Sequence, residues 1–210
     1  MQTLAQMCTI QIGHTVRGRL EAEAKGVAAI QLRDTRPEGG MAGGGIGRYR
    51  MDPVPDRYWV RPGDVLFRSR GDKNTATALG PEFPPAVAVM PLVILRPNPN
   101  TVDATYLAWW INQPAAQRHF DECAQGQNIR MIPIGCLSAL KIAVPDIATQ
   151  RTIAEVDRLS DHEYDLSTRL ATRRRQLTAF ALHERANRNS SNQNGASSKA
   201  VPHFRKQGDR

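Results

Sequence analysis

The spacing of hydrophobic residues along the chain changes abruptly near residue 145. Leu140, Ile142 and Val144 recur at every second position, which predicts a short, half-buried strand. Pro145 ends this strand, because proline has no amide hydrogen to donate to a sheet. Beyond it, apolar residues recur at three- and four-residue steps, at Ile153, Val156, Leu159, Leu166, Leu170, Leu177 and Phe180. This second spacing predicts a long helix with one apolar stripe.

The sequence before residue 145 predicts a domain that mixes strands with short helices. Apolar runs and alternating patterns predict strands at 8–12, 27–32, 63–69, 86–90 and 92–97. Residues 103–113 predict a helix with Asp103 as its N-cap, and a second helix is expected from Pro114 to Gly126. Residues 36–57 are dense in glycine and proline, so we expect an exposed loop. The predicted fold class is α+β: a mixed, β-rich domain with small helices, followed by one long coiled-coil-forming helix.

The long helix fits a heptad repeat when Val156 is placed at position a. Six of the eight a and d positions are then apolar, and the exceptions are Glu163 and Arg173. Either Asp146 or Thr149 can cap its start. About 36 residues make a helix of roughly 54 Å, longer than a small domain is wide, so we expect the stripe to contact another helix. Packing of the stripe on its own domain is the alternative.

Positive charge is concentrated at the C-terminal end. The formal net charge is +8; residues 169–210 contain ten Lys or Arg and two acidic residues, whereas residues 1–168 contain 18 of each. A high pI therefore does not by itself indicate nucleic-acid binding, and a solvated basic tail is the alternative. Residues 188–210 have almost nothing to bury. We expect a domain at 1–145, a helix at 146–187 and a disordered basic tail.

The sequence shows no export or membrane signal. Its start has no basic segment leading into an apolar one, and its longest apolar run of ten residues is too short to span a bilayer. Cys8, Cys123 and Cys136 are odd in number and widely spaced, which does not indicate a disulfide framework. We therefore expect reduced thiols and a soluble protein of a reducing cytoplasm.

Four motifs, in the same order, resemble the specificity (S) subunits of type I restriction-modification systems. Residues 137–161 (LSALKIAVPDIATQRTIAEVDRLSD) resemble the junction where a strand, a proline-containing turn and a Gln-Arg-x-Ile-Ala element lead into a long helix. That element here is Gln150, Arg151, Thr152, Ile153 and Ala154. The other three motifs are IQIGHTVRG (10–18), WVRPGDVLFRSRG (59–71) and CAQGQNIRMIPIGCLSALKI (123–142). The resemblance extends from about residue 4 to residue 185.

The resemblance implies a target-recognition domain that binds double-stranded DNA, and a spacer helix. It implies a non-catalytic chain that holds no cofactor, with S-adenosylmethionine bound by an adenine methyltransferase (modification) subunit. A motor-nuclease subunit is a further candidate partner. Members of the family carry two recognition domains and two helices, whereas this chain has one of each. It could pair with itself as a homodimer and read a gapped palindrome, pair with another half-subunit, or be a truncated remnant.

The sequence offers little support for chemistry of its own. Glu23 and Lys25 have the Glu-x-Lys spacing of some nucleases, but no acidic residue precedes Glu21 to complete that site. The glycine-rich residues 43–47 follow no predicted strand and open no predicted helix, so they do not indicate a dinucleotide-binding turn. His119, Cys123 and Cys136 lack a Cys-x-x-Cys spacing, which favours core packing over a zinc site. We expect no catalytic residues and no metal.

Candidate DNA contacts are basic and amide residues on loops that follow predicted strands or flank glycines. Arginine can bridge two acceptors of guanine, and asparagine or glutamine can bridge two groups of adenine, in the major groove. The candidates are Arg17, Arg19, Arg68, Arg70, Lys73, Asn74, Gln127, Asn128 and Arg130. Ordinary surface polarity is the alternative for each of them. At the level of function, the alternatives are a protein-binding adaptor and an anti-restriction or regulatory factor that binds a modification subunit through its helix.

Overall fold

The computed structural model describes residues 1–126 and 129–197 of the chain. Contacts within the chain divide it into two units, Met1–Asp157 and Arg158–Arg210. The first unit contains every strand and short helix together with the first turns of the long helix. The first unit thus ends at Asp157, whereas the sequence predicts that the domain ends at residue 145.

The central sheet of the first unit is antiparallel throughout. Its strands, in spatial order, are β2 (Cys8–Ile12), β9 (Leu92–Pro97), β6 (Val65–Arg68) and β7 (Ala76–Ala78). The two middle strands have continuous apolar sequences, which is typical of strands covered on both faces. In β6, Val65 and Phe67 pack among the helices, while Leu66 packs toward the second sheet. The two-residue period of the strand thus supplies side chains to two separate cores.

The second sheet covers one of these faces and is mixed. Its strands, in spatial order, are β4 (Arg48–Tyr49), β3 (Ala22–Ile30), β8 (Ala86–Ala88) and β5 (Trp59–Val60). Only the pairing of β3 with β8 is parallel. Strand β4 and the first two residues of the short helix η2 (Asp56–Tyr58) fall within residues 36–57, so the prediction of loop throughout that range is wrong for them.

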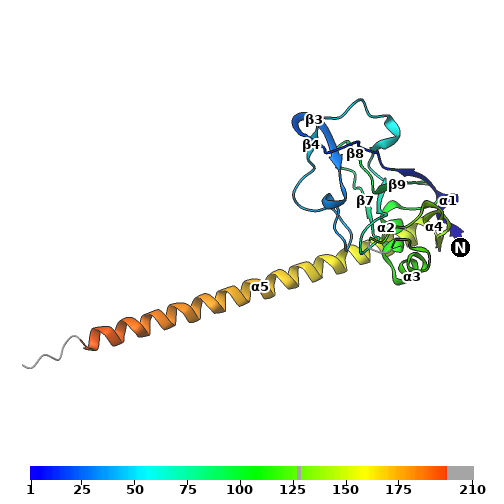
Figure 1. Ribbon diagram of the computed structural model, residues 1–210. Helices are drawn as coiled ribbons and strands as arrows, with labels where there is room; N and C mark the ends of the chain where they lie inside the picture. The colour runs from blue at the N-terminus through cyan, green and yellow to red at the C-terminus, as the bar shows by residue number, and fades with distance from the viewer. Residues whose placement is uncertain (127–128, 198–210) are drawn as a thin grey trace, which may run out of the picture. The chain divides into compact units, whose positions relative to one another are not determined.

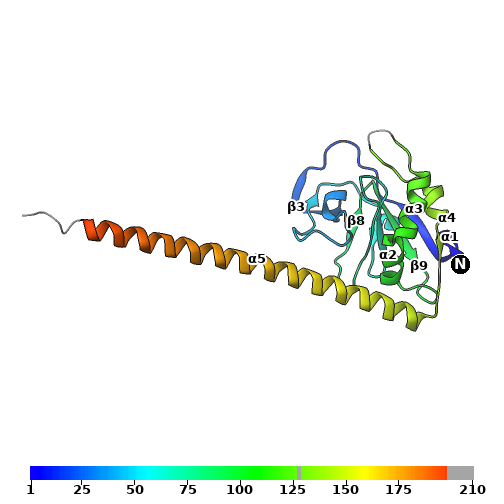
Figure 2. The same ribbon diagram turned by 90° about the horizontal axis from the view of Figure 1, so that it is seen from below.

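Short helices cover the opposite face of the central sheet, and Figures 1 and 2 show α3 and α4 on the side of the first unit away from β3. These helices are α1 (Leu4–Met7), α2 (Ala104–Asn112), α3 (Pro114–Cys123) and α4 (Ile134–Ala139). The side chain of Asp103 accepts hydrogen bonds from the amides of Thr105 and Tyr106, which confirms it as the N-cap of α2. The remaining elements are β1 (Gln2–Thr3), paired with β10 (Lys141–Ile142), and the short helix η1 (Leu32–Asp34).

The long helix α5 (Ile147–Ser197) begins at the predicted cap. Asp146 accepts hydrogen bonds from the Thr149 hydroxyl at 2.6 Å and the Thr149 amide at 2.9 Å. These two hydrogen bonds, the side-chain one first, lower the pKa of the Asp146 carboxyl. A carboxylate whose pKa is lowered by folding stabilises the fold above its unfolded pKa. The cap is therefore complete at neutral pH and weakens as the pH falls through the lowered value.

Helix α5 extends further than the sequence predicts. It contains 51 residues and is about 76 Å long at 1.5 Å per residue. Residues 188–197, predicted to be disordered, continue the helix, since adding a residue to a formed helix costs much less than starting one. The rest of the predicted tail, residues 198–210, lies outside the described residues. Among the helices that are described, none is long and apolar enough to cross a membrane.

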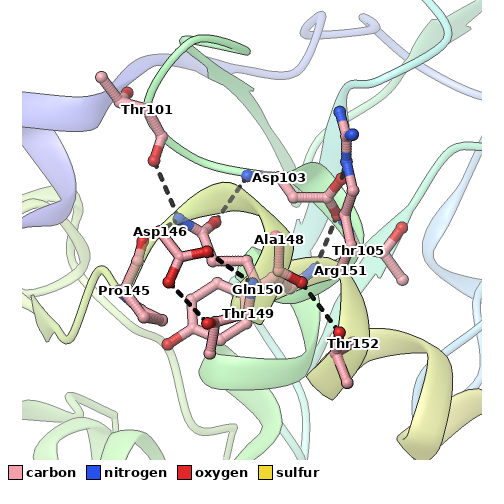
Figure 3. A network of polar contacts seen from close by, with 11 residues as sticks. Thr101, Asp103, Thr105, Pro145, Asp146, Ala148, Thr149, Gln150, Arg151 and Thr152 are labelled. Atoms are coloured by element: carbon pink, nitrogen blue, oxygen red, sulfur yellow. Dashed lines mark hydrogen bonds and ion pairs between the residues drawn. The ribbon is translucent and has the colours of Figure 1, made fainter.

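The Gln-Arg-x-Ile-Ala element fixes the first turns of α5 to the rest of the first unit (Figure 3). Gln150 is fully buried; its Nε2 donates to the carbonyls of Thr101 and Pro145 at 3.0 and 2.8 Å. Its Oε1 accepts from the amide of Asp103 at 2.9 Å, and Arg151 forms an ion pair with the Asp103 carboxylate. Ile153 and Ala154 pack against the helix-side core. The polar residues of this element therefore orient the start of α5, and its apolar residues pack that start against the core.

We expect Gln150→Ala to lower the free energy of unfolding by about 2–3 kcal/mol. The substitution leaves one buried amide and two carbonyls without their partner, and each such loss typically costs on the order of 1 kcal/mol. Urea unfolding followed by circular dichroism measures the change. Gln176→Ala is the matched control, because Gln176 is an exposed glutamine in the same helix. Equal unfolding midpoints for the two variants would contradict the anchoring role of Gln150.

Candidate nucleic-acid interface

Main-chain hydrogen bonds bring two of the predicted basic segments side by side. The amide of Ile132 donates to the carbonyl of Ser69 at 2.8 Å, and the amide of Gly71 donates to the carbonyl of Arg130 at 3.0 Å. The loop that follows β6 therefore lies beside residues 130–132, although some 60 residues separate them in sequence. Neither segment belongs to any of the strands β1–β10, so an alternating strand pattern in the sequence could not predict that the two segments pair.

The turn between β8 and β9 connects this pair to the N-terminal basic segment. The carbonyl of Pro91 accepts from the amide of Ser69 at 3.3 Å, and the amide of Met90 donates to the carbonyl of His14 at 3.0 Å. The hydroxyl of Thr15 also contacts the sulfur of Met90. We call these four adjoining segments, residues 14–19, 69–73, 90–91 and 129–132, the basic rim. The three predicted clusters of DNA contacts thus converge on one continuous region.

The basic rim carries a local excess of positive charge. It contains five basic residues and one acidic residue, Asp72, and therefore has a net charge of +4, although residues 1–168 are neutral overall. Arg17, Arg19, Arg70 and Lys73 are exposed. Within the described ranges, no ion pair engages any of these four side chains. They are available for phosphate or base contacts.

Arg130 is placed differently from the other basic residues of the rim. It is half-buried and forms an ion pair with Asp121 of α3. Its Nε is buried and has no partner among the described residues. This pairing holds the segment after α3 against the helix and leaves less of the guanidinium for DNA. The neighbouring candidates Gln127 and Asn128 lie outside the described residues.

Arg68 does not lie on the surface, which corrects its selection as a DNA contact. Only 8% of the residue is exposed, and its Nη1 donates to the carbonyl of Leu32, the carbonyl of Thr35 and the hydroxyl of Thr35, each at 2.7 Å. Burial lowers the pKa of the guanidinium, against the attraction of Glu38. As the last residue of β6, Arg68 joins the central sheet to the segment around η1, which follows β3, instead of facing solvent.

Asn74 is also buried, and its selection as a DNA contact is corrected for the same reason. Its Nδ2 donates to the carbonyl of Arg68 at 2.9 Å, and its own carbonyl accepts from Gln117 of α3. The residue therefore closes the loop between β6 and β7 against the helix layer. Of the candidates in that loop, Arg70 and Lys73 keep the exposure that a DNA contact requires.

A hollow of about 1010 Å³ opens beside the rim and contains two polar residues that the sequence analysis missed. Arg33 donates to the hydroxyl of Tyr49, and most of its side chain is exposed. The Nε2 of Gln31 is buried without a hydrogen-bond partner in the described part of the chain. Arg19 lines the same hollow. Gln31 and Arg33 come directly after β3, just as Arg70 comes shortly after β6. The sequence analysis did not select them because the predicted strand extended to residue 32, past the observed end of β3 at Ile30.

Two glycines of the resembling motifs are required by the backbone at this region. A Cβ on Gly13 would lie 2.7 Å from the carbonyl oxygen of Leu92, so only glycine allows the first segment to approach β9. Gly63 has φ +87°, and its amide donates to the carbonyl of Leu79 at the entry to β6. Asp64, which follows it, is buried and forms an ion pair with Arg96 at 3.3 Å. These residues thus position the strand that leads into the rim.

One cluster of possible metal ligands occurs in the described residues, and it lies between α3 and α4: His119, Cys123 and Cys136. Cys123 and Cys136 form a disulfide, so the prediction of reduced thiols is wrong for this pair. The two cysteines are 13 residues apart in sequence, and the packing of α3 on α4 brings them together. Cys8 is free and buried, and burial raises the pKa of its thiol to about 12.

No family model matches the sequence, and no curated protein matches it. Solved structures do resemble the fold. A chain from a structure of the type I R-M system matches with a TM-score of 0.57 and 19% identity over 78% of this chain. The S subunit of the type I restriction-modification system from M. genitalium matches with a TM-score of 0.52 and 16% identity over 77% of this chain. The HsdS subunit from Thermoanaerobacter tengcongensis matches with a TM-score of 0.51 and 19% identity over 77%.

These matches establish that the chain has an S-subunit-like fold, as the four motifs imply. The matched region covers 38%, 38% and 37% of the three neighbouring chains, so this chain spans well under half of their length. The predicted α+β class, with a long helix after the β-rich domain, is likewise confirmed.

Proposed function

We propose that this chain is the DNA sequence-specificity subunit of a type I-like restriction-modification complex. The observation that carries the proposal is the convergence of three separate basic segments into one exposed rim on a domain with an S-subunit-like fold. A rim with a charge of +4, within residues 1–168 that have no net charge overall, provides local attraction for a duplex without a generally basic surface.

The exposed side chains of the rim would divide the work of recognition. Arginines such as Arg70 can pair with guanine in the major groove, whereas Lys73 is suited to phosphate. Arg17 and Arg19 extend the contact surface toward the hollow, which Arg19 lines. Base contacts specify the sequence and phosphate contacts set the register, so the two roles predict different mutant behaviour.

Methylation in this proposal belongs to a partner. An adenine methyltransferase subunit would bind S-adenosylmethionine, flip the target base and methylate it, while this chain selects the site. A motor-nuclease subunit is a further proposed partner. The long helix and the rim would dock that machinery over the DNA, and the chain itself would remain non-catalytic.

The apolar stripe of α5 supports a proposed homodimer. Val156, Leu159, Leu166, Leu170, Leu177 and Phe180 are all exposed, at 46–68% of their surface. Ile153 is the exception among the predicted stripe residues, because it packs against the core of the first unit. A heptad stripe with this exposure requires a partner helix. A second copy of the chain would supply it, together with a second recognition domain, and the site read would be a gapped palindrome.

A protein-binding adaptor, or an anti-restriction factor that binds a modification subunit through α5, is the competing function. Both alternatives would involve the exposed stripe of α5, but neither would require the basic rim. Binding to DNA in the presence of the methyltransferase separates them. The specificity subunit promotes methylation at a defined sequence, an adaptor leaves sequence choice unchanged, and an inhibitor lowers methylation.

We expect Arg70→Ala/Lys73→Ala to weaken binding of the recognised DNA by roughly tenfold to a few hundredfold. Each lost base contact costs about 1–3 kcal/mol, and each lost phosphate contact lowers the affinity for all sequences and flattens the salt dependence. Fluorescence anisotropy of the complex with its methyltransferase, at several salt concentrations, measures both effects. Arg118→Ala/Lys141→Ala removes the same charge from exposed positions outside the rim and serves as the control. Equal losses in both variants would show that only total charge matters.

A further inference from the structure

Three soft-metal ligands lie together where α3 meets α4. His119 and Cys123 are four residues apart on α3 and therefore share one face of the helix. Cys136, in the first turn of α4, faces them. The ligand atoms of the three residues all lie within 4.8 Å of one another, and all three side chains are half-buried. The cluster is separate from the exposed side chains of the basic rim.

One distance between ligand atoms of this cluster already fits a tetrahedral metal site, and the two sulfurs would have to separate on reduction to complete it. Zinc binds sulfur at about 2.3 Å and nitrogen at about 2.0–2.1 Å, which places tetrahedral ligands roughly 3.5–3.8 Å apart. The Cys136 sulfur lies 3.7 Å from Nε2 of His119, as such a site requires. The Cα atoms of Cys123 and Cys136 are 6.2 Å apart, a distance that leaves room for two separated sulfurs as well as for a disulfide.

We propose that His119, Cys123 and Cys136 bind one soft divalent metal ion, of which zinc is the expected example, when the disulfide is reduced. The three protein ligands leave a fourth position for water or another donor. The disulfide and the metal would be alternative ways to join α3 to α4, and both would restrain the segment between them, which includes Arg130. The proposal does not depend on the role of the rim in DNA binding.

Replacing the disulfide with a bound metal ion requires one added reductant. A phosphine reduces the disulfide to two thiols and is itself oxidised to the phosphine oxide, with the oxygen supplied by water. Metal binding then displaces two thiol protons to solvent. Nε2 of His119 lies 2.9 Å from the carbonyl of Cys136, so metal binding through Nε2 replaces that hydrogen bond. The ring proton is then held on Nδ1, and the imidazole releases no net proton.

The test is metal binding by the full-length chain after reduction with a phosphine. Titration with Co²⁺ should give the thiolate-to-metal absorption of a tetrahedral site at one ion per chain, and Zn²⁺ should displace it. Cys123→Ser, Cys136→Ser and His119→Asn should each weaken binding by roughly a hundredfold or more, because each removes one of the three protein ligands. Cys8→Ala and His162→Asn are the matched controls, since Cys8 is buried elsewhere and His162 lies on exposed α5; both should bind as the wild type does.

A second measurement uses only the wild-type chain and does not depend on the folding of variants. Zinc should protect Cys123 and Cys136 of the reduced protein from iodoacetamide, as peptide mass mapping can determine, and should leave the labelling of Cys8 unchanged. Equal labelling of both cysteines with and without zinc would overturn the proposal. So would Co²⁺ spectra without thiolate bands in the reduced chain, which would assign the two cysteines to the disulfide alone.

Discussion

Replacing Arg68 with alanine is expected to lower the free energy of unfolding of the first unit, Met1–Asp157, by about 3 kcal/mol. The guanidinium supplies three hydrogen bonds of 2.7 Å to Leu32 and Thr35, at the start and the C-cap of η1. Removing one partner from a buried, charge-assisted set typically costs about 1.5–3 kcal/mol for the lost interaction, plus the cost of the carbonyls left without a donor. Urea unfolding followed by tryptophan fluorescence measures the loss.

Arg70→Ala provides the matched control for this prediction. It removes the same charge two residues away, at an exposed position. Surface substitutions of this kind usually change stability by less than about 0.5 kcal/mol. The expected pattern is therefore reciprocal: Arg68→Ala changes stability, and Arg70→Ala changes DNA affinity. If Arg68→Ala instead unfolded at the wild-type midpoint and lost sequence-specific binding, Arg68 would be a DNA contact after all.

The contrast between Arg68 and Arg70 shows where sequence reasoning reached its limit. Both residues follow the apolar run of β6, and both are arginines beside polar neighbours. The residue at which the strand ends decides which side chain remains inside the fold. Local sequence propensity does not locate the end of a strand to within one residue. The burial of Arg68 also depends on the carbonyls of Leu32 and Thr35, which are more than 30 residues away in sequence.

Short sequence signals correctly predicted the elements that are determined by neighbouring residues. Asp103 and Pro114 mark the helix starts because a cap and an N1 proline act through the next few residues only. Strands β2, β6 and β9 of the central sheet follow from apolar runs that any packed core would bury, whereas β7 (Ala-Thr-Ala) has no such run and was not predicted. Helix α4, by contrast, is six residues long and has no capping side chain, so residues 134–139 carried no signal for it.

Long-range proximity accounts for the remaining differences. The disulfide of Cys123 with Cys136 and the joining of the rim segments both depend on how helices and loops pack, and neither has a characteristic spacing in the sequence. Gln150 is intermediate: its motif could be recognised, but its role as a buried donor and acceptor appears only when Thr101 and Pro145 are seen beside it. A motif can thus be identified before its physical function is known.

The second large effect concerns assembly: Leu166→Glu/Leu170→Glu is expected to convert the proposed homodimer into a monomer. The two leucines are neighbouring d and a positions of the heptad, and about half of each is exposed. In a two-helix seam the substitution would place four carboxylates against one another. Burying such charges without partners costs several kcal/mol, which is sufficient to dissociate most coiled coils. Sedimentation velocity measures the oligomeric state over a range of protein concentrations.

Thr168→Glu/Thr172→Glu is the matched control for this substitution. It adds the same two charges to the same stretch of α5, at f and c positions that face away from the proposed seam. The control should remain dimeric. Circular dichroism should show that both variants keep their helix and that the recognition domain stays folded. Loss of dimers in both variants would mean that general repulsion, and not the stripe, is responsible.

The same pair of variants connects assembly to the DNA sequence that is read. Twofold symmetry makes the two recognition domains identical, so the half-sites must be inverted copies, and helices about 76 Å long would leave unread base pairs between them. Sequencing of modified bases in cells that carry this chain and its methyltransferase should reveal a gapped palindrome. The Leu166→Glu/Leu170→Glu variant should abolish that modification, and the threonine control should retain it. An asymmetric or ungapped motif would contradict self-pairing even if dimers form, because it would require a different second reader or a single one.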